Sequence, residues 1–217
     1  MSYKKAEIIE LKKLKKDGSI DHKILKLVVS ALEKGHFVVL PVDCIYGIVA
    51  PFTPHAGIEI RKLSGHDDHE IERLVSSFKM LDMVADIGKL EFDFLHRIWP
   101  GEIVVRLRQQ GGTNRTVPVR MPRTLFMQEL IAGMDSPLFF TPACGQGGGH
   151  VYKKADIISR FKTKSDYIVL VGEFCKEHNE PSVVDISSGT LSIVNEGRIS
   201  AEEIKSLYFL GKDDITP

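Results

Sequence analysis

The sequence has few cysteines, no long apolar run and no excess of charge of either sign. Its three cysteines do not show the C-x-x-C spacing of zinc and redox sites. No apolar run approaches the roughly 18 residues that a membrane-spanning helix needs. Residues 1–16 carry lysines where a signal peptide needs a continuous apolar block. These absences predict a soluble, cytoplasmic globular protein with no membrane partner.

The charges balance, with 29 basic and 29 acidic side chains. A protein whose whole surface coats nucleic acid would be basic, so that class is excluded. Residues 1–26 nevertheless hold eight lysines against four acidic residues. A local excess of this kind suits RNA phosphates, although it more often marks a solvated face.

The chain has 217 residues, which is enough to bury a sizeable core. It shows no internal repeat and no linker rich in serine and proline. We therefore predict one domain at 17–217, preceded by a loosely attached basic segment at 1–16.

Short apolar runs alternate with helical stretches, which indicates a mixed α/β sheet covered by helices. The late runs at 182–186 and 191–195 flank Ser187-Ser188-Gly189-Thr190 and predict a β-hairpin. The remaining pattern predicts helices at 22–34, 55–63, 88–98, 124–132, 153–161 and 200–208, and strands at 36–41, 103–108, 116–121, 137–143 and 167–172.

The segment LPVDCIYGIVAP at 40–51 follows a strand and gathers polar side chains in an expected loop. Asp43, Cys44 and Tyr46 would offer polar contacts to a substrate. An ordinary strand exit, with a proline stop and a glycine cap, is the alternative that composition favours.

Two further segments suggest ligands by composition. The glycines at 145–149 expose backbone N–H groups before a helix, an arrangement that suits phosphate, but they match neither the Walker nor the dinucleotide pattern. His66-Asp67-Asp68-His69 has no third candidate ligand at the sequence spacing of a known metal site, so we predict no metal site. Composition alone favours a surface loop for the first and a solvated turn for the second.

Cys144 is a candidate nucleophile. No base for it is identifiable from the sequence, and a free cysteine is commonly a small buried apolar residue. The sequence therefore favours a structural role for this thiol.

Six segments, in order, resemble the YrdC/YciO family of threonylcarbamoyl-AMP synthases and their relatives. PVDCIYG is similar to the family's Pro-Thr-Asp-Thr-x-Tyr-Gly signature, and PLFFTPACGQGG stands where the family has Pro-Leu-x-x-Thr-Ser-Ala-Asn-x-Ser-Gly. The Ile-Arg-x-Leu run followed by Gly-His resembles the YciO branch more closely. The six segments lie at 41–51, 60–65, 99–108, 117–122, 137–148 and 181–197.

The resemblance implies a single YrdC/RibB-like α/β (α+β) domain, with a twisted mixed sheet around a concave, positively lined cavity. Family members condense L-threonine, bicarbonate and ATP to threonylcarbamoyl-AMP for tRNA modification, and relatives bind tRNA or double-stranded RNA. The implied ligands are a nucleotide and L-threonine, with ATP and Mg²⁺ entering as substrate and no resident cofactor. The oligomeric state is not predicted.

Transferred motif by motif, the resemblance assigns contacts of two kinds. The nucleotide contacts are Arg61, Lys62, Cys144 and Asn195. The substrate contacts, with Arg120 supporting the cavity wall, are Cys44, Tyr46, Arg120, Thr141, Pro142 and Ser182. The resemblance does not assign a catalytic residue or a metal ligand.

Several of these positions depart from the family pattern. Cys44 replaces a threonine of the first signature, and the Lys-x-Arg pair falls on Arg61 and Leu63. Ser-Ala-Asn becomes Pro142-Ala143-Cys144, and the terminal arginine becomes Asn195. Each lost polar partner weakens binding by about 1–3 kcal/mol. We therefore expect a nucleotide- and RNA-binding relative that has lost the full synthase reaction. The alternative is an active synthase with an altered site.

Overall fold

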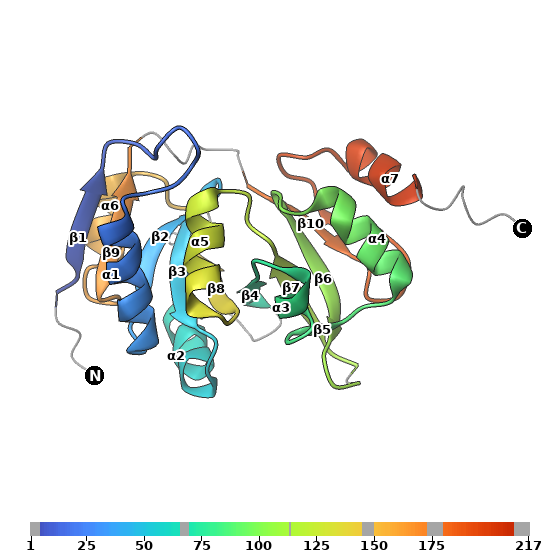
Figure 1. Cartoon of the computed structure of the whole chain (residues 1–217), viewed down its shortest axis with the longest axis horizontal. Helices are drawn as coiled ribbons and strands as arrows, with labels where there is room; N and C mark the ends of the chain where they lie inside the picture. The colour runs from blue at the N-terminus through green and yellow to red at the C-terminus, as the bar shows by residue number, and fades with distance from the viewer. Residues whose placement is uncertain (1–4, 66–69, 113, 145–149, 173–179, 211–217) are drawn as a thin grey trace, which may run out of the picture.

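The computed structural model describes residues 5–65, 70–112, 114–144, 150–172 and 180–210. The charged segment at 66–69, the glycines at 145–149 and Cys175 lie outside these ranges. The described residues form one large mixed sheet, which runs across the molecule from β1 and β9 to β10, with helices on both sides (Figure 1). This confirms the predicted α/β architecture.

The sheet has the order β1-β9-β2-β3-β8-β4-β7-β6-β10-β11, and β5 pairs with β6. The hairpin expected near the end of the chain is confirmed, because β10 and β11 pair antiparallel. The strands are β1 (Glu7–Leu11), β2 (Val38–Val42), β3 (Ile45–Pro51), β4 (Glu72–Leu74), β5 (Ala85–Asp86), β6 (Ile103–Gln109), β7 (Thr116–Arg120), β8 (Leu138–Pro142), β9 (Tyr167–Val171), β10 (Ser182–Asp185) and β11 (Ser192–Asn195).

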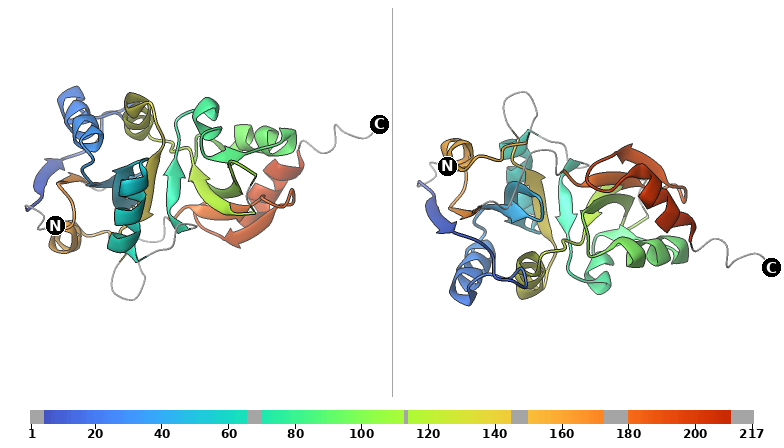
Figure 2. Two further views of the ribbon diagram at one scale, coloured as in Figure 1. Left: turned by 90° about the horizontal axis from the view of Figure 1, so that it is seen from below. Right: turned by 90° about the horizontal axis from the view of Figure 1, so that it is seen from above.

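Helices cover both sides of the half of the sheet that contains β2, β3 and β8. Helices α1 and α5 lie on one side, whereas α2 and α6 lie on the other (Figure 2). No helix of the described residues is both long and apolar enough to span a membrane. The helices are α1 (His22–Glu33), α2 (Pro54–Ser64), α3 (Phe78–Leu81), α4 (Lys89–Ile98), α5 (Leu125–Met134), α6 (Lys154–Phe161) and α7 (Ala201–Phe209).

Local sequence explains where the two helices nearest the first motif begin and end. Asp21 caps α1 by accepting a hydrogen bond from the backbone N–H of Lys23. Thr53 caps α2 in the same way through Ala56, and α2 ends at Gly65, whose φ of +74° suits glycine. Because these signals are local, the sequence predicts both helices to within one residue.

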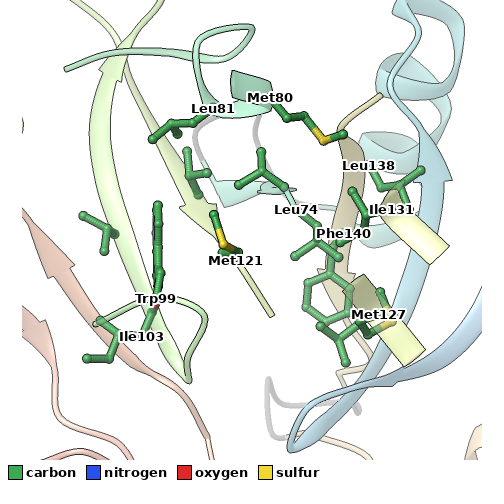
Figure 3. Close-up of a cluster of buried hydrophobic side chains, with 14 of the residues drawn as sticks. Leu74, Met80, Leu81, Trp99, Ile103, Met121, Met127, Ile131, Leu138 and Phe140 are labelled. Carbon is green, nitrogen blue, oxygen red and sulfur yellow. The ribbon is translucent and has the colours of Figure 1, made fainter. Parts of the chain in front are cut away.

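The main core joins the two halves of the sheet. Leu74 of β4 and Phe140 of β8 meet Met127 of α5, while Trp99 and Met121 lie on the far side of the same cluster (Figure 3). Each fully buried side chain of this size contributes about 1.5–3 kcal/mol to folding. A second core cluster lies under α2 and α6.

The expectation of a loop at 40–51 is wrong. These residues form the β2–β3 hairpin, in which Val42 pairs with Ile45 across a turn at Asp43 and Cys44. Strand β3 is buried at all seven positions because helices cover both sides of the sheet here. A strand buried on both faces shows a continuous apolar run, so it lacks the alternation by which strands are recognised.

The N-terminal segment contains a strand that its composition does not predict. Residues Glu7–Leu11 form β1, which lies parallel to β9 at one edge of the sheet. The backbone N–H of Ala6 also donates to the carbonyl of Lys162. This part of residues 1–16 is therefore attached to the sheet, contrary to the expected loose attachment of the segment.

Candidate functional site

The β2–β3 turn carries Asp43 and Cys44, the polar centre of the first motif. Asp43 has a φ of +51°, a left-handed conformation that aspartate tolerates better than most residues. Its Oδ1 accepts hydrogen bonds from the backbone N–H groups of Arg123 and Thr124, each at 2.9 Å. The carboxylate thus caps the start of α5, where Thr124 makes no side-chain cap of its own. The motif aspartate therefore ties this turn to α5.

Arg120, at the end of β7, lies beside this turn and is fully buried. Its Nη2 is 3.0 Å from Glu72 Oε2, and its Nη1 is 4.0 Å from Asp43 Oδ2. The guanidinium also lies over the ring of Phe140 at 5.3 Å. Two carboxylates thus surround one guanidinium, whose charge is compensated inside the protein.

The pKa values of this cluster reflect burial and charge together. Burial raises the pKa of Glu72 above its ordinary value, although Arg120 opposes the shift. Burial alone would lower the pKa of Arg120, but the carboxylates of Glu72 and Asp43 raise it. The guanidinium stays charged, and the cluster depends on it.

A hollow of about 350 Å³ opens beside the β2–β3 turn. This volume falls within the roughly 300–1,000 Å³ of small-ligand sites. Its lining comes from five separate parts of the chain, and its three cations balance its three carboxylates. Those residues are Lys16, Asp17, Gly18, Asp43, Cys44, Glu102, Arg123, Thr124, Leu125 and Arg198.

A second hollow of about 330 Å³ adjoins the first, and Glu102, Arg123 and Arg198 line both. Arg198 Nη1 lies 3.0 Å from a carboxylate oxygen of Glu102. Because Arg198 is 46% exposed, this ion pair is partly screened by water. Of the residues that the sequence suggests as substrate contacts, Asp43 and Cys44 line the first hollow.

Cys44 enters the site as a neutral thiol. The residue is 3% exposed, and burial raises the pKa of the thiol to about 12. A thiol that keeps its proton at neutral pH is a weak nucleophile. At this position of the motif it can offer a ligand only weak polar contacts.

Tyr46 and Ser182 use their hydroxyl groups within the fold. The Tyr46 hydroxyl donates to the carbonyl of Val171 at 3.0 Å and accepts the N–H of the same residue at 2.9 Å. The Ser182 hydroxyl donates to the carbonyl of Ile199 and accepts the N–H groups of Gly197 and Ile199. A hydroxyl has one donor and two acceptor sites, so Ser182 has no hydrogen-bonding capacity left for a substrate.

Replacing Tyr46 by phenylalanine should lower the free energy of unfolding by about 1–3 kcal/mol, because both backbone groups of Val171 lose their buried partner. Chemical denaturation without ligand measures the loss. Tyr167→Phe is the matched control, since its hydroxyl makes no hydrogen bond within the described ranges, and it should be nearly neutral. Equal stabilities of the two variants would show that the Tyr46 hydroxyl does not support the fold.

The two predicted phosphate cations lie on the last turn of α2. Arg61 Nε donates to the carbonyl of Gly57, and Lys62 Nζ lies 2.8 Å from Glu59 while its side chain remains 66% exposed. Helix α2 lies on the opposite side of the sheet from α5, which borders the first hollow (Figure 2). Arg61 and Lys62 therefore flank the sheet on the side away from that hollow.

The other predicted residues lie along β8 and at the sheet edge. Thr141 is buried, and Pro142 pairs with Gly47 of the first motif. Cys144 follows at once and is half-buried, with its Sγ 4.0 Å from Nδ1 of His150. Asn195 is exposed on β11.

Sequence reasoning missed several residues that shape this region. Glu72 lies in a strand of three residues, which is too short to show a periodic pattern. Arg123 directly follows the family segment at 117–122 but does not belong to it. Glu102 lies in the family segment at 99–108, for which the resemblance assigns no contact, and Lys16 belongs to no motif. Only their shared place in the fold identifies them. The described residues contain no group of three or more histidine, cysteine or acidic side chains that could hold a metal ion.

Comparison with known proteins identifies the family of the chain and agrees with its fold. A family model of Sua5, YciO and YrdC, described as "Telomere recombination", matches residues 30–197. A double variant of P. abyssi Sua5 superposes with a TM-score of 0.81 at 22% identity, over 93% of this chain and 60% of that one. P. abyssi Sua5 complexed with L-threonine gives 0.80 at 21% identity, over 93% and 61%.

The structure of E. coli YciO gives a TM-score of 0.79 at 16% identity, over 92% of this chain and 99% of that one. The chain thus spans about three fifths of the length of the two Sua5 structures and nearly all of YciO. At these identities the solved structures establish the fold.

Proposed function

The chain belongs to the Sua5, YciO and YrdC family, and on that basis we propose that it binds an adenine nucleotide and an amino acid without completing the synthesis of threonylcarbamoyl-AMP. The first hollow would take the amino acid. The cations at the end of α2, Arg61 and Lys62, would take the phosphates of ATP, which enters with Mg²⁺ as its counterion.

The observation that carries this proposal is the hollow at the motif turn. Its balanced charges suit a zwitterion, because Arg123 and Arg198 can face a carboxylate while Asp17 and Glu102 can face an ammonium group. L-threonine is bound by one of the structural relatives. Charge complementarity within a hollow of this size therefore favours an α-amino acid over a purely anionic ligand.

The proposed loss of the synthase reaction rests on hydrogen-bonding groups at the motif positions. Pro142 supplies no hydroxyl, Cys44 supplies a buried neutral thiol, and the Ser182 hydroxyl is saturated within the fold. Each missing partner of a developing charge costs about 2.7–4 kcal/mol in transition-state stabilisation. Two such losses lower turnover by more than a thousandfold.

An RNA partner is supported by a separate observation. Lys12, Lys13, Lys15 and Lys16 are all exposed, and Lys16 also borders the first hollow. Lysines in this arrangement suit the phosphates of tRNA or double-stranded RNA. Binding should weaken steeply as salt rises, because phosphate contacts release counterions. A flat salt response would reject this part of the proposal.

Thermal unfolding with ATP, AMP and L-threonine, alone and combined, tests the ligands. A ligand at about 100 times its dissociation constant stabilises the fold by about 2.7 kcal/mol. The ATP shift should disappear in the double variant Arg61→Ala with Lys62→Ala and persist in Arg123→Ala. The threonine shift should show the reverse pattern, which makes each variant the control for the other.

Pyrophosphate release with ATP, threonine and bicarbonate tests the reaction. We expect no release above a control without threonine. Threonine-dependent release would instead establish the alternative, an active synthase with an altered site. Absence of any ligand shift would reject the binding proposal itself.

A further inference from the structure

Cys144 faces a base that the sequence alone does not identify. His150 lies six positions along the chain, and the backbone brings it directly opposite Cys144 in an isolated antiparallel bridge. The N–H of Val151 donates to the carbonyl of Ala143 at 2.7 Å, and the N–H of Ala143 donates to the carbonyl of Tyr46 at 2.8 Å. The pair is therefore fixed to the end of the β3–β8 ladder, beside the first motif.

The side chains are placed for proton transfer. Sγ of Cys144 is 4.0 Å from Nδ1 of His150, and both side chains are half-buried. The His150 ring meets the ring of Tyr152 edge-on at 6.3 Å. The Tyr152 hydroxyl in turn donates to Glu180 at 2.5 Å, so the residue that contacts the imidazole is itself held in place.

We propose that Cys144 and His150 form a nucleophilic pair that accepts an acyl group from an activated carbonyl compound. The Cys144 sulfur attacks the carbonyl carbon and forms a thioester bond, and the carbon–oxygen bond to the leaving group breaks. The thiol proton passes to Nδ1 of His150 and from there to the leaving oxygen. Sulfur, carbon and proton are thus all accounted for, and no oxidant or metal is required.

The electrostatics favour this chemistry over spontaneous thiol reactivity. Burial raises the pKa of the Cys144 thiol, although Arg160 on α6 opposes the shift. Burial lowers the pKa of His150, although Glu180 opposes it. At neutral pH the pair is therefore a protonated thiol beside a neutral imidazole. Such a thiol needs the imidazole to remove its proton during attack.

The place of the pair suggests its natural acyl donor. Cys144 stands where the resemblance puts a contact to the adenylate, so an acyl adenylate would present its activated carbonyl near the sulfur. This identification of the donor rests on the proposed function. The reactivity of the pair does not, because any small activated ester can report it.

The test uses p-nitrophenyl acetate as the acyl donor, with Cys175 replaced by serine to leave two thiols. Release of p-nitrophenolate gives the rate, and mass spectrometry of peptides locates the acetyl group. We expect a burst with acetyl on Cys144 and none on Cys44, whose buried thiol serves as the internal control. Cys144→Ser should abolish the burst. Acetylation of Cys144 no faster than that of free cysteine would overturn the proposal.

The pH profile separates a base from a merely structural histidine. Because His150 must be neutral to accept the proton, the wild-type rate should fall as pH drops through a pKa below about 6.5, and level off above it. In His150→Asn the rate should fall on the order of 100-fold and rise only as the thiolate forms, above the ordinary thiol pKa of 9.0. If the wild-type rate also rose only as the thiolate forms, the proposal would be rejected, whether or not the variant folds.

The ester carries no nucleotide, so the two proposals fail separately. Acetylation of Cys144 without any thermal shift by ATP would keep the pair and reject the nucleotide. A thermal shift by ATP with an inert Cys144 would reject the pair and keep the nucleotide.

Discussion

Arg120→Met is expected to lower the free energy of unfolding by about 3–5 kcal/mol, because it leaves the carboxylates of Asp43 and Glu72 buried without a cation. Methionine has a similar length, so the loss reports the missing charge more than a cavity. The guanidinium lies within 3.0 Å of Glu72 and has no exposed surface, so water does not screen the interaction. Urea denaturation at neutral pH measures the effect.

The pH dependence of the stability of Arg120→Met shows whether the uncompensated carboxylates cause the loss. The pKa of Glu72 is already raised in the folded state, and removing Arg120 raises it further. A carboxyl group with a raised folded pKa favours the folded state below its unfolded pKa and loses that contribution as pH rises through the folded value. The deficit of Arg120→Met should therefore be largest near neutral pH and shrink as pH falls toward 4.5, the ordinary value for this group.

Two comparisons make the expectation specific. Glu72→Gln combined with Arg120→Met should recover part of the stability, since one uncompensated charge is then absent. Arg198→Ala, which breaks the partly exposed pair with Glu102, should cost only about 0–1 kcal/mol. If Arg120→Met and Arg198→Ala lowered the free energy of unfolding by equally small amounts, the buried cluster would contribute little to the stability of the fold.

Gly47→Ala is expected to lower the free energy of unfolding by about 3 kcal/mol, the upper end for overpacking, and the melting temperature by roughly 6–12 °C. A Cβ at this position would collide with the ring of Phe140 and with the backbone carbonyl of Thr141. The ring can turn only into a filled core (Figure 3), and the carbonyl belongs to the central strand β8. Displacing either neighbour would therefore destabilise the folded state.

Gly57→Ala is the matched control for this prediction. Its Cβ would approach only the Phe139 ring, at 3.2 Å, and alanine favours the helix at this position of α2 by about 1 kcal/mol over glycine. We expect a change within about 1 kcal/mol in either direction. If Gly47→Ala caused only a small loss of stability, the glycine of the first motif would be required for a ligand and not for the packing of β3 against β8.

Much of the fold could be predicted from local signals. The capped amphipathic helices and the final hairpin follow from spacing and turn residues close in sequence. The missed elements failed for physical reasons: β3 is buried on both faces and shows no alternation, while β4 and β5 have three and two residues. Strand β1 carries three exposed residues at the sheet edge, and its pairing with β9 depends on residues about 160 positions away.

The amino-acid sequence by itself determined the family and the identity of the motif residues, because six short segments in a fixed order carry that information without any geometry. The tertiary structure alone decided what those residues touch. It buried Arg120 between two carboxylates, saturated the hydroxyl of Ser182 and brought His150 to Cys144. These outcomes depend on contacts between distant strands and loops, and the burial that sets their charge states exists only once the sheet has formed.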